Sequence, residues 1–261
     1  MGLRRLFGMG DGDGDGRGAG EVDTRITSLA CMPGQPVEAE VVIRGGARGL
    51  AVDGLDLEVK VRAIRWDGSS SEEFVCDLSS SGWTEHVAAG AEQRLAFRGR
   101  LPWETPVTEI GGQAVGVVVS VVTKLSWDSE APVADSDLLH VTAPPLYDAV
   151  LAAFAEEGYR VGDSQVRDSY IPDAESQSGH YQTLFLTAPT RGADRFAELE
   201  LVLHQNAVGA MAYVRRADRS ALEWEEKPPT RTFAAAHHEV GHADFGPRVR
   251  DTLEKLALLD G

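Results

Sequence analysis

Apolar and charged residues alternate most regularly between positions 55 and 62. The apolar positions are Leu55, Leu57, Val59 and Val61, and the charged ones between them are Asp56, Glu58, Lys60 and Arg62. Successive side chains of a strand point to opposite faces, so this pattern predicts a strand with one buried and one solvated face. Weaker forms of the pattern predict strands at 22–29, 37–43, 94–97 and 138–141.

A run of valines that follows two prolines predicts the central strand of an all-β domain. Pro102 and Pro106 fix φ and donate no backbone hydrogen bond, so 102–108 is expected to be extended chain outside a sheet. A Gly-Gly pair then permits a turn, and 115–122 is valine at nearly every position. An apolar run without polar alternation is typical of a strand buried on both faces. Polar stretches predict loops at 69–71, 79–81 and 126–137.

The residues after position 143 predict a second set of strands and two helices. Pro145 suits the first turn of a helix, and an apolar stripe of Leu146, Val150 and Phe154 predicts that helix over 146–157. Strands are expected at 159–166, 180–186, 196–203 and 208–214, and an amphipathic helix at 248–259. Frequent short strands are typical of sandwiches. The chain therefore predicts two tandem β-sandwiches, over 21–142 and 143–261, after a flexible Gly/Asp-rich segment at 1–20.

Composition and charge exclude several classes of protein. The 261 residues are 43% apolar and 25% charged, enough for a packed core, and the formal net charge of −16 opposes binding to nucleic-acid phosphates or anionic membranes. Two cysteines, Cys31 and Cys76, make no disulfide framework and suit a reducing cytoplasm. We find neither a signal peptide nor an apolar run of about 18 residues, so the chain is expected to be cytoplasmic, without an integral membrane segment.

Several short segments resemble one family of bacterial regulators. They are Val22-Asp23-Thr24, Met32-Pro33-Gly34-Gln35-Pro36-Val37, Ile43-Arg44-Gly45-Gly46, Leu55-Asp56-Leu57 and Pro102-Trp103-Glu104-Thr105-Pro106-Val107-Thr108. The Pro144-Pro145 pair, the helix around Val150 and Gly158-Tyr159 follow. On these residues the chain resembles the sporulation-control proteins of the stage-zero M type, over nearly its whole length from Val22 onward. The ETPVT segment is the most specific part of the resemblance.

The resemblance implies two tandem arrestin-like β-sandwich domains, with one short connecting helix and a C-terminal helix. It also implies a non-enzymatic regulatory protein that acts through protein contacts in developmental or cell-morphology control. It carries over no catalytic residue, no metal and no cofactor. We expect exposed edge strands and grooves between the halves to bind the partner. The identity of the partner, self-association and whether the host sporulates stay open.

The motif His238-Glu239-Val240-Gly241-His242 supports a different hypothesis, a zinc-dependent hydrolase. In zinc peptidases with H-E-x-x-H, a helix brings both histidines to one face and the glutamate acts as general base. Gly241 weakens such a helix, and Gly246-Pro247 would end it within a turn. An incidental or structural metal at these histidines is a further alternative. We favour a plain polar connection between a strand and a helix.

The N-terminal segment carries two more hypotheses. Asp11, Asp13 and Asp15 alternate with glycines like the start of an EF-hand calcium loop, but Val22 stands where the loop requires a glutamate. A flexible acidic tail is the favoured interpretation. The basic-apolar residues Leu3, Arg4, Arg5, Leu6 and Phe7 suggest a third class of function, a membrane-surface adaptor.

Single histidines, cysteines and tryptophans add little chemistry. His180 and His204 lie on predicted strands, where a hydrogen-bonded structural histidine is more common than a catalytic base. Cys31 and Cys76 are expected to be packed or idle thiols. Core or loop packing is expected for Trp66, Trp83, Trp103 and Trp127, with an interface as the alternative.

Overall fold

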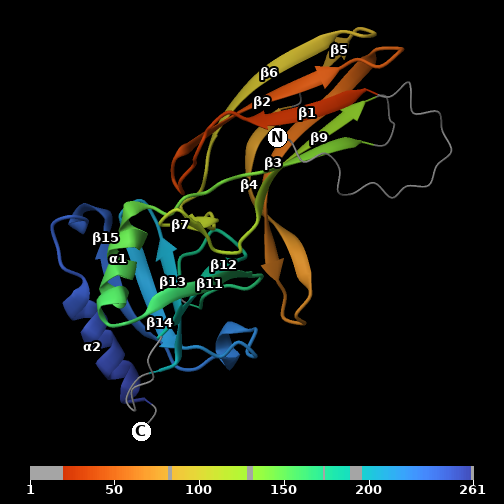
Figure 1. Ribbon diagram of the computed structural model, residues 1–261. Helices are drawn as coiled ribbons and strands as arrows, with labels where there is room; N and C mark the ends of the chain where they lie inside the picture. The colour runs from red at the N-terminus through yellow and green to blue at the C-terminus, as the bar shows by residue number, and fades with distance from the viewer. Residues whose placement is uncertain (1–19, 82–83, 128–131, 173, 189–195, 260–261) are drawn as a thin grey trace.

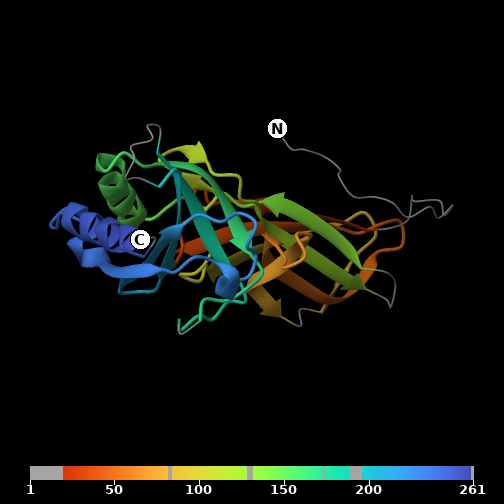
Figure 2. The ribbon, with the colours of Figure 1, turned by 90° about the horizontal axis from the view of Figure 1, so that it is seen from below.

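The computed structural model of the chain describes residues 20–81, 84–127, 132–172, 174–188 and 196–259. The molecule is elongated, with most of the first ten strands at one end and five strands with both α-helices at the other (Figures 1 and 2). The strands of the first half are β1 (Glu21–Ile26), β2 (Pro36–Arg44), β3 (Leu50–Ile64), β4 (Ser70–Ser81), β5 (Glu85–Val87), β6 (Glu92–Arg100), β7 (Glu109–Ile110), β8 (Gln113–Ala114), β9 (Val119–Trp127) and β10 (Val133–Leu138).

The first half packs two sheets against each other. One sheet has the order β1-β2-β6, and the other runs from β10 through β9 to β3, with β4 and β5 also paired to β3. The alternation on β3 is confirmed, because its four apolar positions from Leu55 to Val61 are at most 1% exposed. The sheets also meet at their edges, where the backbone N–H of Thr24 donates to Asp135 Oδ2 over 2.7 Å.

The central strand differs from its prediction at both ends, and it is not buried on both faces, because buried and half-buried residues alternate along β9. β9 begins at Val119, whereas the valine run predicted a strand at 115–122. Gly116 has a φ of +84° and interrupts the extended chain after the short β7–β8 hairpin. At its other end β9 continues into the predicted loop at 126–137, whose far part pairs with it as β10. Hydrogen bonding to a neighbouring strand overrides the polar composition there.

Two other loop predictions are wrong for the same reason. The serine triplets at 69–71 and 79–81 lie mostly within β4, which pairs with β3 along most of its length. The strand expected at 138–141 is reduced to the end of β10 and a single bridge between Cys31 and Val141.

The second half forms one sheet with both α-helices on one face (Figure 1). Its elements are α1 (Pro145–Glu156), β11 (Arg160–Arg167), β12 (Tyr181–Thr187), β13 (Glu198–Gln205), β14 (Gly209–Arg216), the 3-10 turn η1 (Trp224–Glu226), β15 (Arg231–Ala236), the 3-10 turn η2 (His237–Glu239) and α2 (Gly246–Ala257). All four strands expected here lie within two residues of their predictions. The stripe of α1 is buried, as are Val249 and Leu256 of α2. We call the opposite side of β12–β15 the outer face.

One residue pair joins the sheets of the two halves. Arg167 at the end of β11 pairs with Ile64 at the end of β3, and the two strands run parallel. Ten strands therefore form a continuous sheet. The fold class is confirmed as mostly β-strand, with one short connecting helix and a C-terminal helix. The finer division into arrestin-like sandwiches at 21–142 and 143–261 stays a prediction. Except for Gly20, the segment 1–20 lies outside the described residues.

Candidate functional site

Residues 102–108, the junction segment, cross from the first half and bind to the second. The Glu104 carboxylate accepts hydrogen bonds from the hydroxyls of Ser176 (2.6 Å) and Ser178 and from the backbone N–H groups of Gln177 (2.9 Å) and Ser178 (3.1 Å). Burial would raise the pKa of Glu104, but these hydrogen bonds hold the pKa below its usual range. Glu104 therefore stays ionised and fastens the loop before β12 to the first half.

Two further contacts strengthen this fastening. The side-chain amide of Gln182 accepts from the Val107 N–H over 2.7 Å and donates to the Val107 carbonyl over 2.8 Å. The ring of Trp103 lies 5.0 Å from the ring of His237, measured between centroids. Trp103 also lies against Gly34, where an added Cβ would be 2.5 Å from the indole. The segment 102–108 lies outside the sheets as predicted, but it is not extended throughout, because Trp103 and Glu104 form a turn that the Thr105 N–H closes on the Pro102 carbonyl. Its side chains hold the two halves together.

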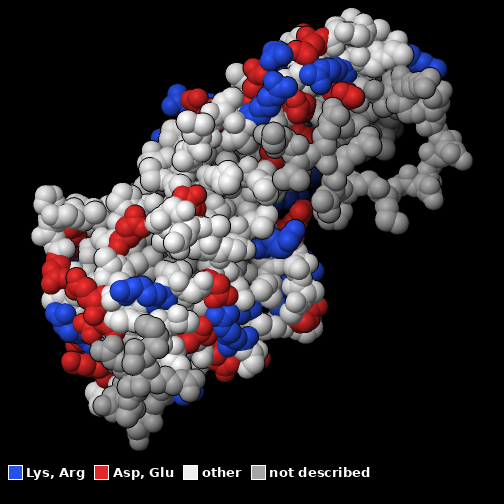
Figure 3. All heavy atoms as spheres, viewed as in Figure 1, with Lys and Arg blue, Asp and Glu red and all other residues white. Residues whose placement is uncertain are grey.

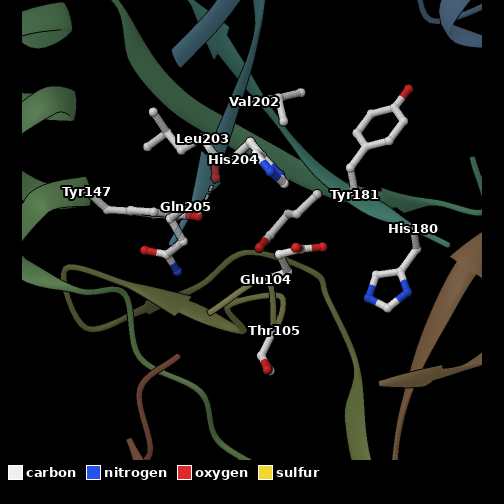
Figure 4. A pocket seen from close by; sticks show the side chains of 10 residues that line it. Glu104, Thr105, Tyr147, His180, Tyr181, Val202, Leu203, His204 and Gln205 are labelled. Carbon is white, nitrogen blue, oxygen red and sulfur yellow. Dashed lines mark hydrogen bonds between the residues drawn. The ribbon is translucent and has the colours of Figure 1, made fainter. Parts of the chain in front are cut away.

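Behind the junction segment lies a small cavity of about 20 Å³ (Figure 4). Glu104 and Thr105 line it from the first half, and α1, β12 and β13 line it from the second. Gln205 is 2% exposed, and neither its amide nor Nε2 of His180 has a hydrogen-bond partner in the described part of the chain. Burial lowers the pKa of His180, which favours the neutral ring. The cavity has room for about one water molecule, which suits a structural role for His180.

A larger hollow of about 640 Å³, the β14–β15 groove, lies at the end of the outer face near the β13–β14 turn. Its lining consists of His204, Asn206, Val208, Gly209, Ala210, Met211, Ala234, Ala235, Ala236, His238, Glu239 and Arg248. Glycine and alanines make much of this lining, which leaves room for larger side chains of a ligand. Val208 is 72% exposed and Met211 is 38% exposed, so apolar surface faces solvent here.

Glu239 and Arg248 cover the free edge of β15 beside this groove. Glu239 accepts the Ala236 N–H over 2.8 Å, and Arg248 Nη1 donates to the Ala234 carbonyl over 3.0 Å. The two side chains also form a two-fold ion pair, with Nη1 2.9 Å from Oε2. Hydrogen bonds from Arg248 lower the pKa of Glu239 to about 2. We call this arrangement the edge clamp, because it satisfies two backbone groups that a further strand would otherwise bind.

The H-E-x-x-H motif therefore does not form the helix that zinc peptidases require. His237 to Glu239 make the 3-10 turn η2, and a turn follows before α2 begins at Gly246. Glu239 is engaged in the edge clamp. Within the described residues, no three His, Cys, Asp or Glu side chains are placed to hold a metal ion together. The favoured prediction of a polar strand-to-helix connection describes the geometry of this segment.

A buried charged cluster lies at the other end of the outer face, and the sequence pattern did not predict it. Glu200 has no exposed surface, and its carboxylate accepts from Arg215 Nη2 (2.9 Å), Lys227 Nζ (2.9 Å) and the Thr183 hydroxyl (3.0 Å). Burial would raise the pKa of Glu200, but Arg215 and Lys227 hold it below its usual range. Trp224 of η1 covers the Arg215 guanidinium at 3.9 Å. The signal in the sequence was Glu200 between Leu199 and Leu201 in an otherwise apolar part of the strand, since such a charge requires buried partners.

The remaining candidates from the sequence lie apart from these sites. Cys31 is buried, Cys76 is half-buried, and both are free thiols. Burial raises the pKa of the Cys76 thiol to about 12, which agrees with an idle thiol. The calcium-like tract from Asp11, the membrane-adaptor residues 3–7 and Trp83 lie outside the described residues. In the part that is described, no helix is long and apolar enough to span a bilayer.

Fold and site together define a β-rich protein with two fastened halves and an apolar groove at one sheet edge. The model of the Spo0M family, described as SpoOM protein, matches residues 14–221. The chain therefore belongs to the Spo0M family of sporulation-control proteins, and the family resemblance is confirmed.

Two further comparisons, with a protein sequence and with a solved structure, gave matches. The sporulation-control protein spo0M of Bacillus subtilis (strain 168) is 28% identical over 214 residues, which cover 79% of this chain and 80% of that protein. The crystal structure of Spo0M from Bacillus subtilis gives a TM-score of 0.76 at 23% identity, over 92% of this chain and 99% of that one. The second comparison shows that the fold is shared.

Proposed function

We propose that this chain is a non-enzymatic regulatory protein of the sporulation-control type that acts in the cytoplasm through protein contacts. Its membership of the Spo0M family supports the regulatory role. The observation that carries the contact mechanism is the β14–β15 groove, with Val208 and Met211 exposed beside a strand edge. Apolar hollows next to a strand edge are typical sites for binding another polypeptide.

Charge supports a protein partner over a nucleic acid. The formal net charge is −16. Acidic and basic side chains are interspersed over both halves on the side of the molecule in Figure 3. An extended phosphate backbone is bound by a continuous basic surface, whereas a mixed surface is common at protein interfaces.

The contact mechanism can be tested by photo-crosslinking in the native host. A photoreactive amino acid at Met211 is expected to give a covalent adduct with a distinct partner protein. The matched control places the same amino acid at Phe74, which is 53% exposed on β4 of the first half and does not line the groove. Equal adducts from both positions, or none from Met211, would contradict a partner at the groove.

Zinc content distinguishes this proposal from the hydrolase hypothesis. After dialysis of untagged protein against a mild chelator, we expect clearly less than one zinc per chain and no change in His238→Ala, because Glu239 is held by Arg248. Elemental analysis gives the measurement. One zinc per chain that disappears in His238→Ala, with a hydrolytic activity lost in Glu239→Gln, would favour the hydrolase instead.

A further inference from the structure

Among the residues that the structure describes, the charged cluster under η1 holds more positive than negative charge. Arg167 and Arg215 are each 2% exposed, and the Lys227 side chain has no exposed surface. Within the described part of the chain, Glu200 is the carboxylate that bonds to this group, through Arg215 and Lys227. Guanidinium groups keep their proton in proteins, so the two arginines exceed Glu200 by one positive charge even when Lys227 is neutral. A charged Lys227 would make the excess two.

Two buried donors in the same place lack an acceptor. Among the residues that the structure describes, neither Nε of Arg167 nor the hydroxyl of Tyr181 has an acceptor, although the Arg215 guanidinium lies close enough to the Tyr181 oxygen to lower its pKa. Arg167 and Tyr181 lie directly opposite each other in the β11–β12 pair. Side chains of opposed residues stand on the same side of a sheet with their Cβ atoms about 5 Å apart. The two donors therefore belong to one site.

The charges of the cluster act on one another. Burial lowers the pKa of Lys227, Glu200 raises it, and Arg215 and Arg167 lower it further. Burial also lowers the pKa of Arg167, whereas Tyr181 and Glu200 raise it, and Arg215 and Arg219 lower it. The like charges of Arg167 and Arg215 thus lie close enough to repel, in a place where water is excluded. Uncompensated buried charge of this kind is strongly unfavourable.

We propose that Arg167, Tyr181 and Arg215 form a binding site for a small inorganic anion of the halide type. The excess positive charge attracts the ion, and Arg167 Nε and the Tyr181 hydroxyl donate to it. Trp224 closes the site toward solvent, and Ile171 and Val202 pack beside Tyr181. This close apolar packing favours a monatomic ion over a phosphate.

Bromide in place of chloride gives a direct test. Crystals of the full chain grown in sodium bromide are expected to show an anomalous peak within hydrogen-bonding distance of Arg167 Nε and the Tyr181 hydroxyl. In solution, Tm is expected to rise and then saturate as sodium chloride replaces sodium gluconate at constant ionic strength, because an ion that binds only the folded state stabilises it.

Variants connect this response to the cluster. Arg167→Met keeps the length of the side chain and removes the charge, so it is expected to abolish both the bromide peak and the chloride response. It is also expected to melt above the wild type in gluconate, because the excess charge is gone. Tyr181→Phe, which keeps the ring, is expected to need several-fold more chloride for half of the response.

The control variant removes a positive charge that acts on Arg167 but is 42% exposed and lies outside the proposed site. Arg219→Met breaks the exposed pairs with Asp163 and Glu198 and is expected to keep the chloride response. The absence of a bromide peak, or a chloride response in Arg167→Met equal to that of the wild type, would overturn the proposal. A peak without any chloride response would mean an adventitious ion only, which overturns it as well. If Arg167→Met does not fold, Tyr181→Phe decides the question alone.

Discussion

The two ends of the outer face differ in solvation, because one buries charged side chains and the other exposes apolar ones. Along β14, Arg215 is buried at one end while Met211 is exposed at the other, although both side chains point to the same side. At the closed end, η1 covers a charged cluster. At the open end, the β14–β15 groove leaves apolar surface to water. A buried charge and an exposed apolar hollow are each unusual, so each requires a specific partner.

The difference teaches where the partners come from. At the closed end, the chain supplies them itself, since Lys227 and Trp224 come from the segment that lies over the sheet. At the open end, the edge clamp supplies partners for the backbone of β15, but Val208 and Met211 stay exposed. Stability is therefore expected to depend on the closed end, and binding on the open end.

Glu200→Gln is expected to have the largest effect on this comparison. It leaves Arg215 and Lys227 buried without their carboxylate, so the free energy of unfolding should fall by about 3–5 kcal/mol. Urea unfolding followed by circular dichroism gives the value. The control Glu198→Gln changes a residue on the same strand as Glu200. It breaks only an ion pair with Arg219 at the surface and should cost less than about 1 kcal/mol. Equal losses in the two variants would show that the cluster is not what stabilises the closed end.

Trp224→Ala is expected to destabilise the closed end by less than Glu200→Gln does. It removes the ring over Arg215 and the edge contacts with Tyr181 and Tyr213, at a cost of about 2 kcal/mol. Hydrogen exchange should accelerate in the segment around η1 and stay unchanged at the β13–β14 turn. The control Trp66→Ala changes a side chain that is 70% exposed and should stay within about 0.5 kcal/mol. Faster exchange at both ends would contradict their independence.

Acid should remove the advantage of the closed end. The pKa of Glu200 is lower in the folded state than its ordinary value, so its contribution is complete above the ordinary value and is lost as pH falls through the folded value. The difference in unfolding free energy between wild type and Glu200→Gln should therefore shrink below about pH 4.3. Urea titrations of both proteins at several pH values measure it. A difference that stays constant down to strong acid would rule out the charge of Glu200 as its origin.

Met211→Asp is expected to have the smallest effect on stability. The side chain is already 38% exposed, so the free energy of unfolding should change by about 0.5 kcal/mol or less. A charge in the apolar groove should nevertheless abolish partner binding, measured by crosslinking from Val208. Phe74→Asp, on exposed surface of the first half, should retain it. Full crosslinking in Met211→Asp would move the partner away from the groove.

Local pattern predicted the elements whose environment is uniform along their length. The alternation around Leu57 and the stripe around Val150 depend on periodicity within one segment, and both predictions are confirmed. The valine run failed because composition does not show the positive φ of Gly116 or the pairing that extends β9. The serines of β4 failed similarly, since β3 supplies their hydrogen bonds from elsewhere in the chain.

The sites were harder to predict because they join residues that are distant in sequence. Lys227 meets Glu200 across 27 positions, and Glu104 meets Ser178 across 74. Glu239 was identified by a motif, yet its role depends on Arg248 and the edge of β15, which the motif does not contain. Spacing alone therefore suggested a metal ligand set where the fold builds an edge clamp.

The pairing of Arg167 with Ile64 has a mechanical consequence. The sheet narrows there to one pair of residues, and a sheet bends most easily where it is narrowest. A force on the far end of the second half would rotate that half about this residue pair and would not stretch a strand. The junction segment would oppose this rotation, because the hydrogen bonds of Glu104 and Gln182 connect the same two halves. The connection between the two halves therefore depends on this residue pair and on the side chains of the junction segment.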